Sequence, residues 1–157
     1  EMIAENKNIY LRNFKIGGMP QTATTVGIKY NAPKYWYAGL NYNYFANIFL
    51  SPNPDRRTSE SISGYATSHE QYNEILDQTL LENGDAVNLY CGKSWKIYKN
   101  NSYLRLNINI NNVLNNTSFR TGGFEQLRYD VTNINRFPNK YGYMYGRTFF
   151  IMLSYLF

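Results

Sequence analysis

The side chains that most often carry enzyme chemistry are few and dispersed in this sequence. His69 is the only histidine, and no neighbour stands out that would orient it as a base. Cys91 is the only cysteine, and it shares the parity of nearby apolar residues, which favours an inert thiol. The spacing of Cys and His does not fit zinc, and the aspartates are too dispersed for a calcium loop: Asp55, Asp77, Asp85 and Asp130. We therefore predict no enzyme and no metal or other cofactor.

Residues suited to binding are more plentiful. Two long polar stretches, at about 46–85 and 114–145, are rich in Gly, Asn and Arg and also carry aromatic rings. Their candidate ligand-binding residues are Arg56, Arg57, Arg120, Phe124, Arg128 and Tyr129, accompanied by Tyr65, Tyr72, Arg136 and Tyr141. Packing of the two stretches on each other explains the same residues equally well.

In the segments that would position these stretches, apolar and polar residues alternate with a period of two. In Tyr103 to Val113, aliphatic residues alternate with Asn and Arg, and alternate residues of a strand face opposite sides of a sheet. The same pattern predicts six strands, at about 8–14, 22–30, 35–45, 86–97, 103–113 and 146–157. Only His69 to Leu81 has the spacing of a helix.

One face of these strands is predicted to be rich in amides and hydroxyls. Its members are Tyr37, Asn41, Asn43, Asn88, Tyr90, Arg105, Asn107 and Asn109. They suit a hydrated wall, and they also suit a path for a ligand such as a sugar or peptide. The opposite face is apolar, with Leu104, Leu106, Ile108 and Ile110 as its clearest row.

Three features favour a bilayer as the environment of the apolar face. The strands are about twice the usual soluble length, and eleven residues at ~45° tilt rise about 25 Å, the height of an outer-membrane barrel's apolar band. Aromatic residues such as Trp36, Trp95 and Tyr155 lie near strand ends, as in an interfacial girdle. Short and long connections alternate, which is typical of outer-membrane barrels.

Composition excludes several other classes. The chain has 157 residues, a mean hydropathy of −0.52 and 17% aromatic residues, and disordered chains are poor in aromatics. The longest apolar run, Phe149 to Leu153, is much shorter than a membrane-spanning helix. The net charge of +5 comes from scattered Lys and Arg, whereas a nucleic-acid binder concentrates them on one face.

The end of the chain is where the sequence becomes specific. Its alternate residues resemble the signal that the barrel-assembly machinery reads in bacterial outer-membrane proteins: Phe149, Ile151, Leu153, Tyr155 and Phe157. The wider chain resembles the C-terminal part of TonB-dependent receptors of the Bacteroidetes type. The resemblance lies in Pro20–Ala23, Gly27–Trp36, Asn43–Phe45, Pro54–Thr58, Asn111–Asn116, Gly122–Arg128, Phe137–Tyr141 and Gly146–Phe150.

The resemblance implies an all-β, antiparallel transmembrane β-barrel segment, the last six or so strands of a barrel of about 22. Residues 1–157 would form barrel wall, with outer loops at about 46–85 and 114–145, in a bacterial outer membrane. The function implied is uptake of a bulky nutrient: a glycan, peptide, siderophore or cobalamin-like compound. Its implied partners are membrane lipid, lipopolysaccharide, an N-terminal plug, TonB and, in some subfamilies, a surface lipoprotein lid.

Neither a plug domain, a TonB-contacting segment nor a signal peptide is visible in the sequence, so we expect these parts to lie outside it. Six strands would also leave two open edges, which are costly in hydrocarbon. Two alternatives remain. A complete eight-stranded barrel, acting as an adhesin or structural protein, needs another hairpin within 46–85. A soluble lectin-like β-sandwich needs shorter strands.

Overall fold

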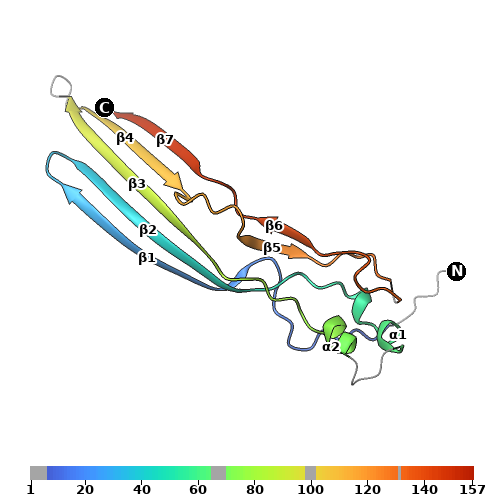
Figure 1. Ribbon diagram of the computed structural model, residues 1–157. Helices are drawn as coiled ribbons and strands as arrows, with labels where there is room; N and C mark the ends of the chain where they lie inside the picture. Colours follow the sequence, from blue (N-terminus) through green and yellow to red (C-terminus); the bar gives the residue numbers. More distant parts are fainter. Residues whose placement is uncertain (1–6, 65–69, 98–101, 131) are drawn as a thin grey trace. The chain divides into compact units, whose positions relative to one another are not determined.

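Alternating residues form five long strands in the computed structural model, which describes residues 7–64, 70–97, 102–130 and 132–157. The strands are β1 (Pro20–Ala32), β2 (Trp36–Ile48), β3 (Gly84–Ile97), β4 (Ser102–Asn111) and β7 (Thr148–Leu156). They lie side by side in the order β1-β2-β3-β4-β7, and β2, β3, β4 and β7 are antiparallel to their neighbours (Figure 1). The predicted all-β class and antiparallel sheet are therefore confirmed.

The short and long connections leave this sheet at opposite ends. Pro33–Tyr35 is the turn between β1 and β2, and both Lys34 and Tyr35 have a positive φ, as tight hairpin turns require. The end of β7 pairs with the start of β4, so the chain finishes at the same end as that turn. The long connections 49–83 and 112–147 join the strands at the other end. Of the second short turn, residues 98–101 lie outside the described residues.

The register confirms the two predicted faces. On one face Ala38, Cys91, Ile108 and Ile151 lie in one row across four strands. On the other, Tyr90 lies beside Asn109, which lies beside Phe150. The same-parity neighbours extend these rows, so that the Leu104–Ile110 row and the amide-rich set occupy opposite faces.

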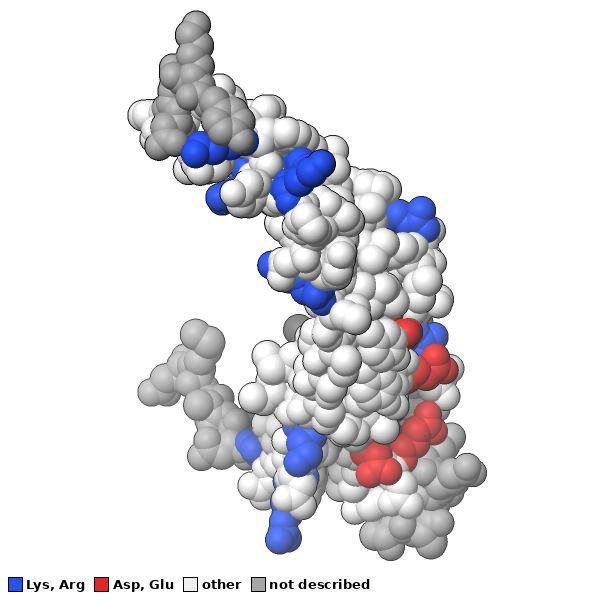
Figure 2. Space-filling model, turned by 90° about the vertical axis from the view of Figure 1, so that its left-hand side faces the viewer, with Lys and Arg blue, Asp and Glu red and all other residues white. Residues whose placement is uncertain are grey.

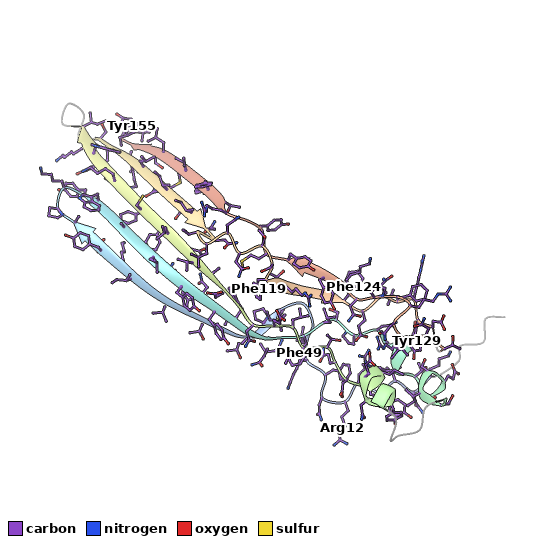
Figure 3. The ribbon with its side chains drawn as sticks, in the orientation of Figure 1. Arg12, Phe49, Phe119, Phe124, Tyr129 and Tyr155 are labelled. Atoms are coloured by element: carbon purple, nitrogen blue, oxygen red, sulfur yellow. The ribbon has the colours of Figure 1, made fainter. Side chains whose placement is uncertain are left out.

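The apolar face is open to its surroundings. Ile28 is 72% exposed, and Ile151 and Leu153 are each 65% exposed. Figure 3 shows the side chains of the five strands standing out from the sheet on both sides. The Leu104–Ile110 residues themselves are half-buried, because neighbouring side chains of the same face surround them. The row is not packed inside a globule.

The remaining residues form shorter elements. A 3-10 turn η1 (Asp55–Arg57) and helices α1 (Ser59–Ile62) and α2 (Glu70–Leu76) lie in the first long connection, and strands β5 (Arg120–Phe124) and β6 (Lys140–Tyr143) pair in the second. The helix predicted from His69 to Leu81 is thus shorter than expected. Its C-terminal end is extended instead, since Leu80 pairs with Phe49 and the Leu81 N–H donates to the Ile48 carbonyl. His69 lies outside the described residues.

The prediction of a strand at 8–14 is wrong, so the main sheet has five strands and not six. In that segment Ile9 makes an isolated bridge to Thr58. Asn13 has a φ of 64° and the Phe14 N–H bonds back to the Leu11 carbonyl, which turns the chain out of an extended course.

The chain divides into two compact units. The sheet unit comprises residues 22–46, 83–119 and 143–157, and the loop unit comprises residues 1–21, 47–82 and 120–142. The loop unit has its own apolar core, in which Leu50 and Ile75 are fully buried and Ile48, Leu81 and Ile134 nearly so. Among the described residues, no helix is both long and apolar enough to span a membrane.

Candidate functional site

The loop unit is organised around Arg57, whose side chain has no exposed surface. Its Nη1 donates to the Asn53 carbonyl at 3.1 Å, its Nη2 to the Asp77 carbonyl at 2.9 Å, and its Nε to the Leu76 carbonyl at 3.3 Å. Both Nη atoms also donate to the Glu125 carboxylate, with 2.8 Å between Nη2 and Oε1. The five N–H groups of the guanidinium thus meet five acceptors.

Glu125 and Asn53 complete this buried cluster. The Glu125 carboxylate accepts from the Asn53 N–H at 2.8 Å, and the Asn53 side-chain amide donates to the Gln126 carbonyl at 2.7 Å. The ring of Phe14 lies 4.8 Å from the Arg57 guanidinium carbon. The Arg57–Glu125 pair therefore links the first long connection to the second, and the Phe14 ring adds the N-terminal segment to the same cluster.

Arg57 is consequently a structural residue in this geometry. A ligand arriving from solvent would find neither an exposed surface nor an unoccupied N–H on it. The predicted association of the two polar stretches has a concrete form here, because residues from both are buried against each other.

The other candidates form two separate pairs of cations and rings. The Arg56 guanidinium carbon lies 6.0 Å from the centre of the Tyr129 ring, and that of Arg120 lies 4.4 Å from the Tyr141 ring across β5 and β6. Such arrangements hold a guanidinium by cation–π attraction while leaving part of it accessible. The Arg56 Nε is buried without a hydrogen-bond partner in the described part of the chain.

Phe124 and Arg128 are exposed and follow one another closely along the second connection. Phe124, at the end of β5, is 53% exposed, and Figure 3 shows it separated from Tyr129. Arg136 pairs with Asp130 at 2.7 Å and stacks 5.6 Å from the Phe137 ring. Tyr65 lies outside the described residues. A single pocket that gathers all six candidates is not seen among the described residues, and their role in ligand binding stays a prediction.

Asp130 forms a polar turn with the residues that follow it. Its Oδ1 accepts from the Thr132 hydroxyl at 2.7 Å and from the Thr132 N–H at 2.9 Å, and its Oδ2 accepts from Arg136. These bonds, that of Arg136 first, hold the pKa of the Asp130 carboxyl well below its ordinary range.

We expect this turn to loosen in acid. A carboxyl with a lowered folded-state pKa contributes stability above its unfolded pKa of about 3.9, and that contribution falls as the pH drops further toward the folded value. Hydrogen exchange at the Thr132 and Asn133 amides, corrected for intrinsic rates, should show protection falling below about pH 4. Asp130→Asn should remove this pH dependence, and an equal loss in that variant would contradict the assignment.

The amide-rich face of the sheet unit forms a hydrogen-bonded lattice. The Tyr37 hydroxyl donates to the Asn107 side chain at 2.7 Å, and the Thr25 hydroxyl donates to that of Asn43 at 2.9 Å. The Tyr90 ring lies over Gly39 and the Tyr37 ring over Gly92, so closely that a Cβ at either glycine would overlap the ring. Near the β1–β2 turn this face is hollowed by about 590 Å³, with Ser94 and Arg105 among the lining residues.

Two members of the buried cluster, Glu125 and Asn53, were not among the candidates predicted from the sequence. Glu125 is a single acid inside a predicted loop, and nothing in its spacing indicates that Arg57 is its partner. Asn53 offers a faint signal, because it stands between two prolines before an aspartate, where an Asn side chain often caps a turn; its Oδ1 indeed accepts from the Asp55 N–H at 3.0 Å.

The chemistry of these clusters is that of binding and packing. In the described part of the chain, three or more His, Cys, Asp or Glu residues do not gather in any place that could hold a metal ion. Cys91 is a free, exposed thiol on the apolar face. On the side shown in Figure 2, Lys and Arg are spread over the surface in several groups, one of them beside Asp and Glu, and do not form one basic patch.

Fold and sites together define an all-β protein with one long antiparallel sheet and a second unit built from residues 1–21 and the long connections. Comparison of the chain with protein-family models, curated proteins and solved structures finds no match in any of the three.

Proposed function

We propose that this chain is barrel wall and extracellular loop from the C-terminal part of a TonB-dependent outer-membrane receptor. In this proposal the protein takes up a bulky nutrient, which is a glycan, a peptide, a siderophore or a cobalamin-like compound. It is a transporter and not an enzyme, and it lies in a bacterial outer membrane.

The observation that carries the proposal is the exposed apolar face. From Ile28 on β1 to Ile151 on β7, aliphatic and aromatic side chains cover one side of five strands. Exposing apolar surface to water costs free energy, and monomeric soluble proteins rarely expose a contiguous apolar patch of more than a few hundred Å². Lipid removes this cost, whereas the amide-rich face suits a wet lumen.

The dimensions of the sheet support the same environment. Strands β1, β2 and β3 have 13, 13 and 14 residues, and about eleven residues suffice to cross the apolar band at a ~45° tilt. Tyr30 and Trp36 meet edge to face near the β1–β2 turn, with ring centres 5.9 Å apart. Rings of this kind prefer the membrane interface.

The loop unit supports the role of receptor. Barrel receptors capture ligand outside the cell, and here the two long connections fold together, with Arg56, Arg120, Phe124, Arg128 and Tyr129 at or near its surface. In the proposal, ligand binding there leads to rearrangement of a plug, powered through TonB. The barrel-assembly machinery reads the C-terminal residues, and lipopolysaccharide or a lipoprotein lid meets the outer surface.

The proposal is tested on the full protein in its native cells. We expect it to fractionate with the outer membrane, to need detergent for extraction, and to change gel mobility on boiling, as folded barrels do. Uptake of a labelled ligand from the four classes should stop when TonB is deleted. Recovery as a detergent-free soluble protein would favour the sandwich alternative, and an intact mass near 18.4 kDa would favour a small complete barrel.

A further inference from the structure

We infer that the apolar face of the sheet binds one anionic glycerophospholipid, with its phosphate at Lys93 and an acyl chain in the groove that begins there. This inference rests on the proposed function, because it requires that the face lie in a bilayer. It adds a specific lipid site to what would otherwise be a uniform lipid-facing surface.

Lys93 is unusual because it is a cation in an apolar row. It lies opposite Trp36 on β2 and opposite Leu106 on β4, and Trp95 follows it on the same face. Tyr30 packs edge to face against Trp36. The lysine is therefore framed by three rings that have both apolar and polar edges, as residues at the headgroup level of a membrane do.

The Lys93 side chain bends toward the end of the sheet. Its Nζ donates to the Lys34 carbonyl in the β1–β2 turn at 3.0 Å, so the ammonium lies at the turn while its methylenes cover apolar surface. Two of its three N–H groups have no partner among the described residues. They are available to a phosphate oxygen.

The surrounding charge is entirely positive. Lys34 adds a second cation in the turn, and neither residues 20–48 nor residues 86–118 contain a single Asp or Glu. The upper part of Figure 2 accordingly shows blue residues and no red ones. An anion is the complementary partner, and it would be attracted more strongly than in water because the neighbouring medium is apolar.

An apolar groove continues from Lys93 along the face. A hollow of about 290 Å³ lined by Trp36, Lys93 and Leu106 adjoins one of about 200 Å³ lined by Ala38, Leu89 and Ile110, and both are lined by Cys91 and Ile108. The groove exists because two small residues, Ala38 and Cys91, face each other between larger pairs. From residue 93 to residue 89 it runs about 13 Å, which suits the upper part of an acyl chain.

The two cations and the adjoining apolar groove together indicate which ligand fits the site. A free phosphate would leave the groove empty. A zwitterionic lipid such as phosphatidylcholine would bring its own cation close to Lys93 and Lys34, whereas an anionic phospholipid supplies a phosphate without that repulsion. Lipopolysaccharide has the same two parts, but in the proposed orientation the short turns face the periplasm, where the leaflet is made of glycerophospholipid.

The test is native mass spectrometry of the full protein, purified in mild detergent and exchanged into mixed micelles of phosphatidylglycerol and phosphatidylcholine. We expect one phosphatidylglycerol to be retained in preference to phosphatidylcholine. Lys93→Gln should lower that retention about tenfold to a hundredfold, the value of one charge-assisted hydrogen bond. Ala38→Phe, which fills the groove without removing a charge, should lower it comparably.

Lys29→Gln is the matched control, because Lys29 lies at the same end of the sheet but on the opposite face, over the Tyr37 ring. It should leave retention unchanged. Equal retention by Lys93→Gln and the unmodified protein, equal loss in the Lys29 control, or no preference for phosphatidylglycerol would overturn the inference. If the protein fractionates with the outer membrane and shows one of these results, the lipid site alone fails; if it does not enter the membrane, the proposed function fails first.

Discussion

Arg57→Ala is expected to lower the free energy of unfolding of the loop unit by about 3–5 kcal/mol, because it leaves the Glu125 carboxylate buried without its counter-charge. The substitution also removes the donors to three backbone carbonyls, those of Asn53, Leu76 and Asp77. The lost contacts involve three segments of the loop unit, around residues 53, 76–77 and 125, so the effect should be cooperative across that unit.

Hydrogen exchange measures this effect at defined amides. The Leu50 N–H bonds to the Thr79 carbonyl and the Ser51 N–H bonds to the Gly123 carbonyl, both at 3.0 Å within the loop unit. Their protection should fall together in the variant, as members of one cooperative unit do. Amides of the paired strands β3 and β4, such as that of Cys91, should keep their protection. Unchanged protection at Leu50 and Ser51 would contradict the structural role of Arg57.

Two further variants separate charge from shape. Arg56→Ala changes the neighbouring, partly exposed arginine and should cost less than about 1 kcal/mol, since its contact to Tyr129 is a cation–π pair at 6.0 Å. Arg57→Met combined with Glu125→Leu removes both buried charges and should recover part of the loss. Arg57→Lys should recover little, because an ammonium does not offer the two parallel bonds of a guanidinium.

The features of the fold that could be predicted from the sequence are those with a local cause. Alternation fixes which side of a strand each residue faces, so Leu106 and Asn107 were assigned to opposite faces and the register agrees. The same reasoning fails at 8–14. There the alternation around Ile9 and Leu11 is real, but the segment packs on Arg57, and the Tyr10 N–H bonds to the Arg57 carbonyl. A local pattern does not show which distant residue will form hydrogen bonds with the backbone of the segment.

The candidate site illustrates the same division. Arg57 was found from its residue type and its place in a long connection, but its role depends on Glu125, 68 positions away. Long-range pairs of this kind have no periodic signature. Arg56 and Arg57 look equivalent in the sequence, yet one is partly exposed and the other fully buried. Only the way in which η1 turns the chain distinguishes them.

The environment of the sheet is tested most directly by Ile108→Arg. Ile108 lies in the middle of the apolar face, beside Cys91 on one side and Ile151 on the other. If this face lies in lipid, an arginine near the bilayer midplane should cost about 2–4 kcal/mol, measured as the free energy of folding into lipid vesicles by urea titration of the full protein. Ile108 is only half-buried and its neighbour Ile151 is 65% exposed, so the described residues leave this part of the face open.

Two further arginine substitutions in the same sheet serve as controls, because they test whether the cost of Ile108→Arg comes from lipid. Asn109→Arg places the cation one residue along β4, on the amide-rich face, and should cost little because a wet lumen accepts it. Ile97→Arg places it on the apolar face but at the end of β3, where the cost should fall to about 0–1 kcal/mol, since a long side chain reaches the headgroups. A buried face between two protein layers has no reason to show this dependence on depth. If Ile97→Arg costs as much as Ile108→Arg, or Asn109→Arg costs more than either, the apolar face does not lie in a bilayer.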